Sequence, residues 1–213
     1  LSTKKLSKAL KNKLSDAKIE LVEKNFIQTK PIDFETPQLN DYLVFTSKEA
    51  VKSVLKSETK NVLSKSCLCV GSKTRSFLEK KGFTVLESAD YAEELIQIIE
   101  SKYKTNSFTF FCGNIRRNTI PAFFQQNKIA YNEIVVYETK LKPHQIKESF
   151  DGVLFYSPSG VNSFLENNTL GNKTCFCIGT TTAKALENET KNIVIASQPT
   201  VEHVIDEVIK YYK

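Results

Sequence analysis

An internal repeat constrains the fold of this chain more than any other feature. Residues 41–55 and 151–165 share Asp, Phe, Ser, Val and Leu at positions 110 apart. Three further matches follow in the same order: residues 67–78 with 175–186 at a spacing of 108, 88–99 with 197–208 at 109, and the segments ending at Lys30 and Lys140 at 110. Four ordered blocks indicate two copies of one unit of about 105 residues.

Each copy contains short apolar strands followed by small-residue turns and amphipathic helices. We predict strands at 42–46, 66–70, 109–112, 153–156, 174–178 and 192–196, and helices at 48–56, 181–187 and 201–211. Consecutive apolar residues are typical of strands covered on both faces. The alternation of strands and helices therefore predicts an α/β fold with parallel sheets and right-handed crossovers.

Two stretches that contain proline, Gln28–Pro37 and Glu138–Pro143, mark the candidate domain boundaries. If they run side by side as a connector, residues 1–29 pack with residues 140–213, and residues 30–139 form an inserted domain. The connector strands then lie at about 28–37 and 134–143. We prefer this discontinuous layout, partly because of the resemblance described below.

Composition excludes several classes of protein. The chain is 40% apolar and 25% charged, which argues against wholesale disorder. No apolar run approaches the roughly 18 residues of a membrane helix, and no signal peptide is visible. Because the chain starts at Leu1 and contains no Met, we expect a few residues to precede it. The formal net charge of +6 comes mainly from scattered lysines without interleaved aromatic residues, a pattern more typical of a solvated surface than of a nucleic-acid-binding one. A polyanionic small molecule is also compatible with this charge.

The cysteines are predicted to be buried, reduced thiols. Four of the five form the C-x-C pairs Cys67/Cys69 and Cys175/Cys177, a spacing that puts both side chains on one face of a strand. Zinc sites more often use C-x₂₋₄-C with partners, and the chain has only two histidines. We therefore expect no metal site, and a reducing compartment such as the cytoplasm.

The candidate site lies at the carboxyl ends of the strands, where ligands of parallel α/β proteins bind. These ends carry similar polar or glycine turns, at residues 2–3, 47, 71–72, 113–114, 157–160, 179–182 and 197. Ser, Thr and Asn are also ordinary helix N-caps, so each turn alone has a structural explanation. Together, in a cleft between two domains, helix N-termini and hydroxyls would suit a ligand with several carboxylates.

Several catalytic and nucleotide-binding motifs are absent from the sequence. It contains no G-x-G-x-x-G, no P-loop motif and no G-x-S-x-G elbow. Any catalysis would therefore use few ionisable groups and depend on positioning and electrostatics.

Six motifs, in order, resemble the uroporphyrinogen-III synthase family. They are Val-Phe-Thr-Ser47, Val-Gly71-x-x-Thr74, Val-Tyr137-Glu-Thr139, Phe-Tyr-Ser157-Pro-Ser159-Gly160, Ile-Gly179-Thr-Thr181-Thr182-Ala183 and Pro199-Thr200. The resemblance covers nearly the whole chain. It implies two similar flavodoxin-like domains joined by a two-stranded connector, with the site in the cleft between them. It also implies a lyase of tetrapyrrole biosynthesis that needs no cofactor. Such an enzyme cyclises hydroxymethylbilane, a linear tetrapyrrole with eight carboxylates, to uroporphyrinogen III with loss of water and inversion of ring D.

The resemblance implies roles for individual residues. Tyr137 matches the family's functional tyrosine and is the candidate to hydrogen-bond the departing hydroxyl or to donate a proton to it, whereas the alternative is a structural tyrosine. The candidates for substrate binding are Thr3, Lys4, Ser47, Thr74, Gly113, Arg116, Ser157, Ser159, Gly160, Thr181 and Thr182. Lys4 stands where the family often has arginine, so the bidentate contact of a guanidinium is lost. For Arg116 a structural ion pair is the alternative.

Two other classes of function remain as alternatives. A non-catalytic two-lobed protein could bind an anionic metabolite without turnover. A receiver-like regulator would need a phosphorylatable Asp at the end of a strand, but Asp41 and Asp151 precede their strands. With the enzyme we expect a cytoplasmic monomer that acts on a small molecule and binds neither nucleic acid nor membranes.

Overall fold

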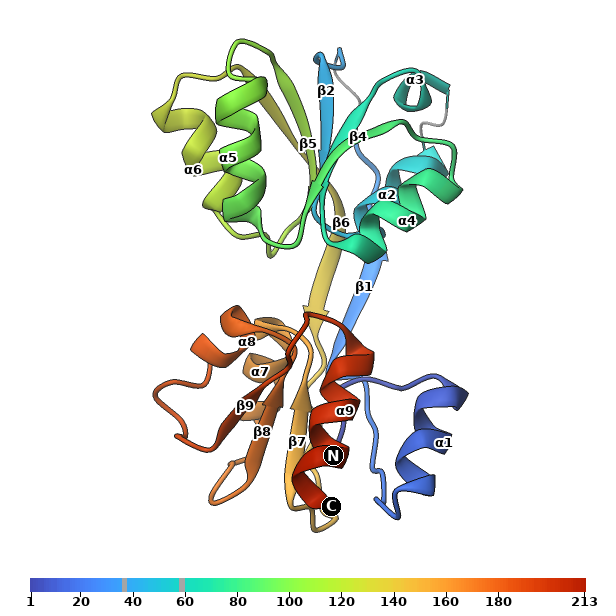
Figure 1. The fold of residues 1–213 in the computed structure, drawn as a ribbon, viewed down its shortest axis with the longest axis vertical. Helices are drawn as coiled ribbons and strands as arrows, with labels where there is room; N and C mark the ends of the chain where they lie inside the picture. The colour runs from blue at the N-terminus through green and yellow to red at the C-terminus, as the bar shows by residue number, and fades with distance from the viewer. Residues whose placement is uncertain (36–37, 58–59) are drawn as a thin grey trace. The chain divides into compact units, whose positions relative to one another are not determined.

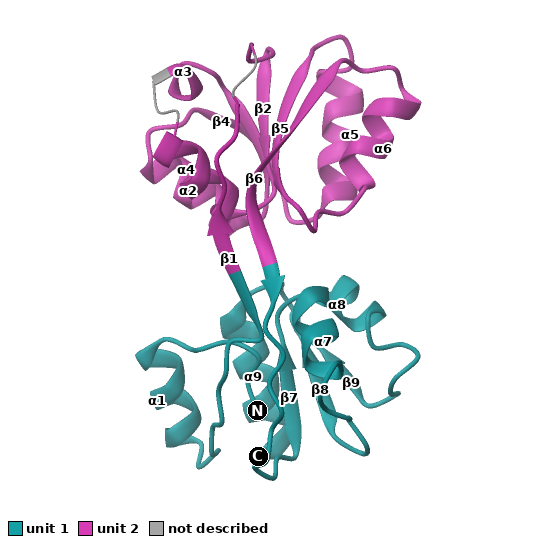
Figure 2. Ribbon diagram, turned by 180° about the vertical axis from the view of Figure 1, so that it is seen from behind, with its two compact units in different colours: residues 1–28, 140–213 teal, residues 29–139 magenta. Residues whose placement is uncertain are grey.

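The chain divides into two units, each built on a mostly parallel sheet. The computed structural model describes residues 1–35, 38–57 and 60–213. Unit 1 consists of Leu1–Gln28 and Lys140–Lys213, and unit 2 consists of Thr29–Thr139 (Figure 2). The α/β class with parallel sheets, predicted from the sequence, is confirmed.

Unit 2 contains a six-stranded sheet in the order β1-β6-β5-β2-β3-β4. Its strands are β1 (Ile27–Pro31), β2 (Tyr42–Phe45), β3 (Cys67–Val70), β4 (Val85–Ala89), β5 (Phe108–Gly113) and β6 (Tyr131–Leu141). Every neighbouring pair from β6 to β4 is parallel. The carboxyl ends of these five strands therefore lie at one edge of the sheet.

Helices cover both faces of this sheet. One face carries α2 (Lys48–Ser57), α3 (Lys60–Leu63) and α4 (Ser72–Lys80), and the other carries α5 (Ala92–Lys102) and α6 (Thr119–Gln126) (Figure 1). Side chains alternate between the two cores, as the pleat of a strand requires. Cys67 and Cys69 pack on the α2 side, whereas Leu68 between them packs on the α5 side.

Unit 1 contains a sheet of β7 (Gly152–Phe155), β8 (Thr174–Cys177) and β9 (Ile193–Ile195), all parallel. Ser2 extends this sheet through isolated parallel bridges to Leu154 and to Glu23. Two cores again flank it. The helices are α7 (Pro158–Leu165) and α8 (Thr180–Lys184) in one core, and α1 (Lys8–Asp16) and α9 (Val201–Tyr212) in the other.

The strand order is the same in both units once the repeat is taken into account. In unit 1 the order is Glu23, Ser2, β7, β8, β9, and in unit 2 it is β6, β5, β2, β3, β4. The repeat pairs β2, β3 and β4 of the first copy with β7, β8 and β9 of the second. Each unit therefore joins the first two strand positions of one copy to the last three of the other.

The chain passes from one unit to the other within β1 and within β6 (Figure 2). These two strands are neighbours in the sheet, and Ile32 N–H donates to the Val136 carbonyl (3.2 Å). β1 ends at Pro31, which cannot donate a backbone hydrogen bond. Residues 36 and 37 of the predicted Gln28–Pro37 stretch lie outside the described residues.

The six predicted strands and three predicted helices are all present. Strand ends differ from the predictions by at most one residue, and the first and last helices are one residue longer than predicted. The middle helix, predicted at 181–187, is α8, which ends at Lys184. Among the described residues no helix is long and apolar enough to cross a membrane.

The prediction that all five cysteines are buried free thiols is confirmed. Burial raises the pKa of each thiol, to about 12 for Cys67, Cys112 and Cys177 and to about 11 for Cys69 and Cys175.

The buried thiols should be unreactive in the folded protein. Because the thiolate is the reactive form, we expect less than one equivalent of thiol per chain to react with a disulfide reagent at pH 8. All five should react in guanidinium. Rapid labelling of two or more thiols in the native state would contradict this burial.

Candidate active site

Tyr137, Ser47 and Gly113 come together at the carboxyl edge of the unit 2 sheet. Ser47 follows β2, Gly113 ends β5, and Tyr137 lies in the neighbouring strand β6. The register between β5 and β6 shifts after Cys112, which brings Gly113 opposite Tyr137. Ser47 Oγ lies 3.1 Å from the Tyr137 hydroxyl and donates to it.

Gly113 is required by the close approach of the Tyr137 ring. A Cβ at Gly113 would lie 2.4 Å from Tyr137 Cζ and 2.8 Å from its hydroxyl oxygen, distances that real Cβ atoms do not adopt. The glycine therefore lets the ring lie across the end of β5. The sequence prediction of a substrate contact at Gly113 did not foresee this packing against Tyr137, and the contact itself stays a prediction.

Hydrogen bonds also fix the loop that follows Gly113. The Asn114 side chain forms two hydrogen bonds with the backbone of Thr139. Its Oδ1 accepts from Thr139 N–H at 2.8 Å, and its Nδ2 donates to the Thr139 carbonyl at 3.4 Å. Asn114 N–H donates to the Tyr137 carbonyl at 3.2 Å. The loop and the strand that carries Tyr137 are thus held together on both sides of the tyrosine.

The Tyr137 phenol is protonated at neutral pH. Burial raises its pKa above the ordinary value, and the hydrogen bond from Ser47 offsets only part of that rise. Ser47 Oγ is oriented in turn because it accepts from Ala50 N–H (3.1 Å) in the first turn of α2. Since Ser47 donates to the phenol oxygen, the phenol's own proton remains available for another acceptor.

Arg116 forms an ion pair within unit 2. Its Nε lies 2.8 Å from Glu133 Oε1, and its NH1 donates to Asn118 Oδ1 at 3.1 Å. The hydrogen bond that Arg116 donates to Glu133 raises the Arg116 pKa, so the guanidinium stays charged. The structure therefore supports the ion-pair alternative for Arg116. Glu133 lies in β6, and sequence reasoning missed it because its partner is distant along the chain.

Thr74 is buried in the first turn of α4, three residues after Gly71. Gly71 has φ +91°, a conformation that side chains other than glycine rarely adopt. Thr74 N–H donates to the Gly71 carbonyl at 2.9 Å, and only 6% of Thr74 is exposed. A residue this buried fits a role in shaping the turn better than direct contact with a ligand.

In unit 1, Thr3, Ser157 and Gly160 come together where α7 begins. Ser157 caps this helix, because its Oγ accepts from Gly160 N–H at 3.1 Å. Thr3 is buried and its hydroxyl donates to the Leu154 carbonyl at 2.7 Å. The hydroxyls of both residues would lie within 3.6 Å of a Cβ at Gly160, so a small residue suits this position. Ser159, in the first turn, is half-buried.

Sequence reasoning missed Tyr156, which ends the strand segment before Ser157. Its hydroxyl lies 3.2 Å from Ser2 Oγ, and burial raises its pKa to about 12. Lys4 Nζ lies 5.8 Å from the centroid of the Tyr156 ring, within the range of a cation–π contact. The position of Tyr156 at the carboxyl end of β7 was the available signal.

Thr181 and Thr182 lie in α8, which begins after Gly179 at the end of β8. Thr182 is buried and its N–H donates to the Gly179 carbonyl at 3.1 Å. Thr181 is half-buried, so of these two residues it is the more accessible to a ligand.

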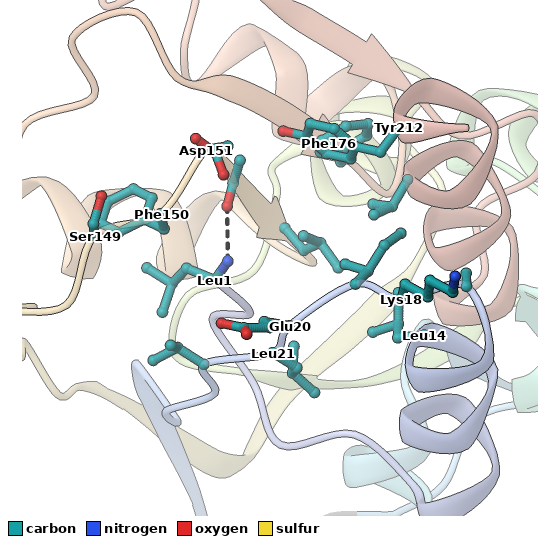
Figure 3. A pocket seen from close by; sticks show the side chains of 16 residues that line it. Leu1, Leu14, Lys18, Glu20, Leu21, Ser149, Phe150, Asp151, Phe176 and Tyr212 are labelled. Atoms are coloured by element: carbon teal, nitrogen blue, oxygen red, sulfur yellow. Dashed lines mark hydrogen bonds between the residues drawn. The ribbon is translucent and has the colours of Figure 1, made fainter.

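A separate cavity of about 620 Å³ lies in unit 1 (Figure 3). Its lining includes Leu14 of α1, Tyr212 of α9, and Asp151 and Gly152 at the start of β7. The cavity is thus at the amino end of β7, and no predicted site residue lines it. Within the described residues, no group of three or more His, Cys, Asp or Glu side chains is arranged to hold a metal ion.

The fold and the polar strand ends define an α/β protein with hydroxyl and amide groups at the carboxyl edge of each sheet. A family model described as uroporphyrinogen-III synthase HemD matches residues 8–206. The chain therefore belongs to the uroporphyrinogen-III synthase family. It is a lyase of tetrapyrrole biosynthesis, and the predicted family and activity are confirmed.

Relatives and solved structures agree with this assignment. The uroporphyrinogen-III synthase of Saccharomyces cerevisiae is 28% identical over 211 residues, covering 81% of this chain and 77% of that protein. Uroporphyrinogen-III synthetase from Helicobacter pylori has the same fold, with a TM-score of 0.69 at 23% identity over 89% of this chain and 92% of that one. A mutant uroporphyrinogen III synthase from Thermus thermophilus has a TM-score of 0.67 at 13% identity over 96% and 93%.

Replacing Gly113 by alanine should displace the Tyr137 ring and break its hydrogen bond with Ser47. We expect the free energy of unfolding to fall by about 1–3 kcal/mol, as for other overpacked sites, and the rate of uroporphyrinogen III formation to fall with it. Urea unfolding and initial rates measure the two effects. Gly179→Ala is the matched control, because a Cβ there meets no atom closer than 4.0 Å. Equal effects of the two substitutions would contradict the packing role of Gly113.

Proposed function

We propose that Tyr137 assists the departure of the hydroxyl group from hydroxymethylbilane. The observation that carries this proposal is the hydrogen bond from Ser47 to the phenol oxygen, at 3.1 Å, on a tyrosine whose pKa is raised by burial. The phenol, which is protonated at neutral pH like other tyrosines, is oriented by this bond and keeps its own proton for another acceptor. It donates a hydrogen bond or the proton to the substrate hydroxyl, which leaves as water and generates an azafulvenium-like cation.

The substrate carboxylates would be bound by hydroxyl and amide groups at the carboxyl ends of the strands. In unit 1, the accessible candidates are Ser157, Ser159 and Thr181, together with the Ser159 N–H in the first turn of α7. Lys4, which directly follows Thr3 in the chain, adds an exposed positive charge. The buried threonines Thr3, Thr74 and Thr182 would shape these turns rather than contact the substrate directly.

The enzyme's main task in this proposal is to hold one conformer of the substrate. The linear tetrapyrrole is reactive and can close unaided to the isomer without ring inversion. A tenfold preference for the spiro route, which inverts ring D, needs only about 1.4 kcal/mol. A few oriented hydrogen bonds can supply that difference, which fits a site with few ionisable groups.

We propose further that the architecture is two similar flavodoxin-like domains, residues 1–29 with 140–213 and residues 30–139, joined by a two-stranded connector. The shared strand order supports this, since each unit follows the flavodoxin order 2-1-3-4-5 when strands are numbered within the repeat. We also propose a cytoplasmic monomer that binds neither nucleic acid nor membranes. The five free thiols are those of a reducing compartment.

Tyr137→Phe tests the role of the phenol. Removing the hydroxyl should lower kcat about 100-fold, in the range for loss of one general acid, while product binding changes little. Steady-state kinetics and an inhibition constant for uroporphyrinogen III measure the two effects. Tyr131→Phe is the matched control, because Tyr131 lies in the same strand and its hydroxyl bonds only Gln125 at 3.0 Å among the described residues. An equal loss of turnover and product binding would assign Tyr137 a binding or structural role.

The isomer composition of the product tests the whole reaction. We expect freshly made hydroxymethylbilane to give the type III isomer with the wild-type protein and mainly the type I isomer without it. Coupled production of the bilane followed by chromatographic separation of the oxidised isomers measures this. Binding of the bilane with only type I product would favour the non-catalytic alternative.

A further inference from the structure

A basic groove lies on unit 2 beside the predicted site. It has a volume of about 330 Å³, and it is lined by Lys48, Ser72, Lys73, Ser76, Phe77 and Lys80. Lys48 begins α2 and the other five residues belong to α4, the helix that packs beside it (Figures 1 and 2). We call this set of six residues the lysine groove. Three lysines and two serines surround one aromatic ring, and none of the described residues that line the groove is acidic.

Two lysines of the lysine groove, Lys48 and Lys80, lie beside acidic residues that pair with other side chains. Glu49, next to Lys48, pairs with Lys52 at 2.7 Å, and Glu79, next to Lys80, pairs with Arg75 at 2.9 Å. Among the described residues, neither Lys48 nor Lys80 forms an ion pair. Two ammonium groups are therefore available for an external anion.

Phe77 gives the lysine groove an apolar surface. The ring is half-buried and packs partly against the unit 2 core, while its remaining surface lines the groove. Lys81 Nζ lies 5.8 Å from the ring centroid, which adds positive charge at the same ring. A flat ring that bears carboxylates matches this combination, because the face can contact Phe77 while the carboxylates meet the lysines and the hydroxyls of Ser72 and Ser76.

The lysine groove is adjacent in the chain to the predicted site. Lys48 directly follows Ser47, whose hydroxyl donates to Tyr137, and Ser72 directly follows Gly71 at the end of β3. Both positions are at the carboxyl edge of the sheet. A tetrapyrrole held at Tyr137 has further rings and carboxylates that need binding partners.

We propose that the lysine groove binds one carboxylate-bearing pyrrole ring of the tetrapyrrole substrate, with Lys48 and Lys80 as its charged contacts. This inference rests on the proposed function, because it places one ring of the same substrate. The groove contributes to affinity and to holding the folded conformer, and it takes no part in loss of the hydroxyl.

The double variant Lys48→Gln/Lys80→Gln tests the proposal. Two lost ion pairs at a solvated site should raise KM for hydroxymethylbilane about fivefold to tenfold while kcat stays within about twofold. The salt dependence of kcat/KM should also weaken, because fewer charge contacts remain to be screened. Lys48→Arg/Lys80→Arg should keep KM within about twofold of wild type, since the charges are retained.

The control is Lys104→Gln/Lys191→Gln, which removes the same net charge from exposed positions just before β5 and β9, at the opposite edge of each sheet. An unchanged KM in the Lys48/Lys80 variant, or an equal rise in the control, overturns the lysine groove as a binding site. A fall in kcat with no change in KM overturns it as well. Because the wild-type isomer assay tests the reaction itself, loss of the proposed function is distinguished from failure of this inference.

Discussion

Parallel alignment of the strands is the constraint on which the rest of this structure depends. The strands from β6 to β4 in unit 2 and from β7 to β9 in unit 1 each run in one direction, so their carboxyl ends meet at one edge although the residues there are far apart in the chain. Ser47 and Tyr137 are separated by 90 positions and still form a hydrogen bond. The crossover helices that parallel strands require begin at the same edge, and their first turns supply N–H groups and capping hydroxyls.

Close packing at that edge sets the orientation and burial of the polar side chains, which the residue types alone do not determine. The Tyr137 ring fits only because Gly113 has no side chain, and burial of that ring raises the pKa of the phenol. A protein of this family that acts on a reactive substrate needs little more than oriented donors. Arg116, in the loop after β5, pairs with Glu133 of β6 and so joins that loop to the neighbouring strand.

Much of the fold followed from local patterns. Apolar strands such as Thr174–Cys177 were predicted to within one residue because they are buried on both faces, which gives runs of consecutive apolar residues. The strand β4 had no such signal, since it lies at the edge of its sheet and is only partly buried. The pairing of Arg116 with Glu133 and the packing of Tyr156 against Ser2 were beyond reach because each depends on contacts between distant segments.

The amino-acid sequence by itself determined the repeat, the α/β class, the burial of the C-x-C cysteines and the family. These follow from periodicity and from ordered motifs, which are local properties. Only the tertiary structure decided which polar residues of the strand ends meet. It placed Tyr137 with Ser47, and it enclosed Thr3, Thr74 and Thr182 among neighbouring groups. The physical reason is that register and packing join segments far apart in the chain, and these set the burial and hydrogen bonding of each side chain.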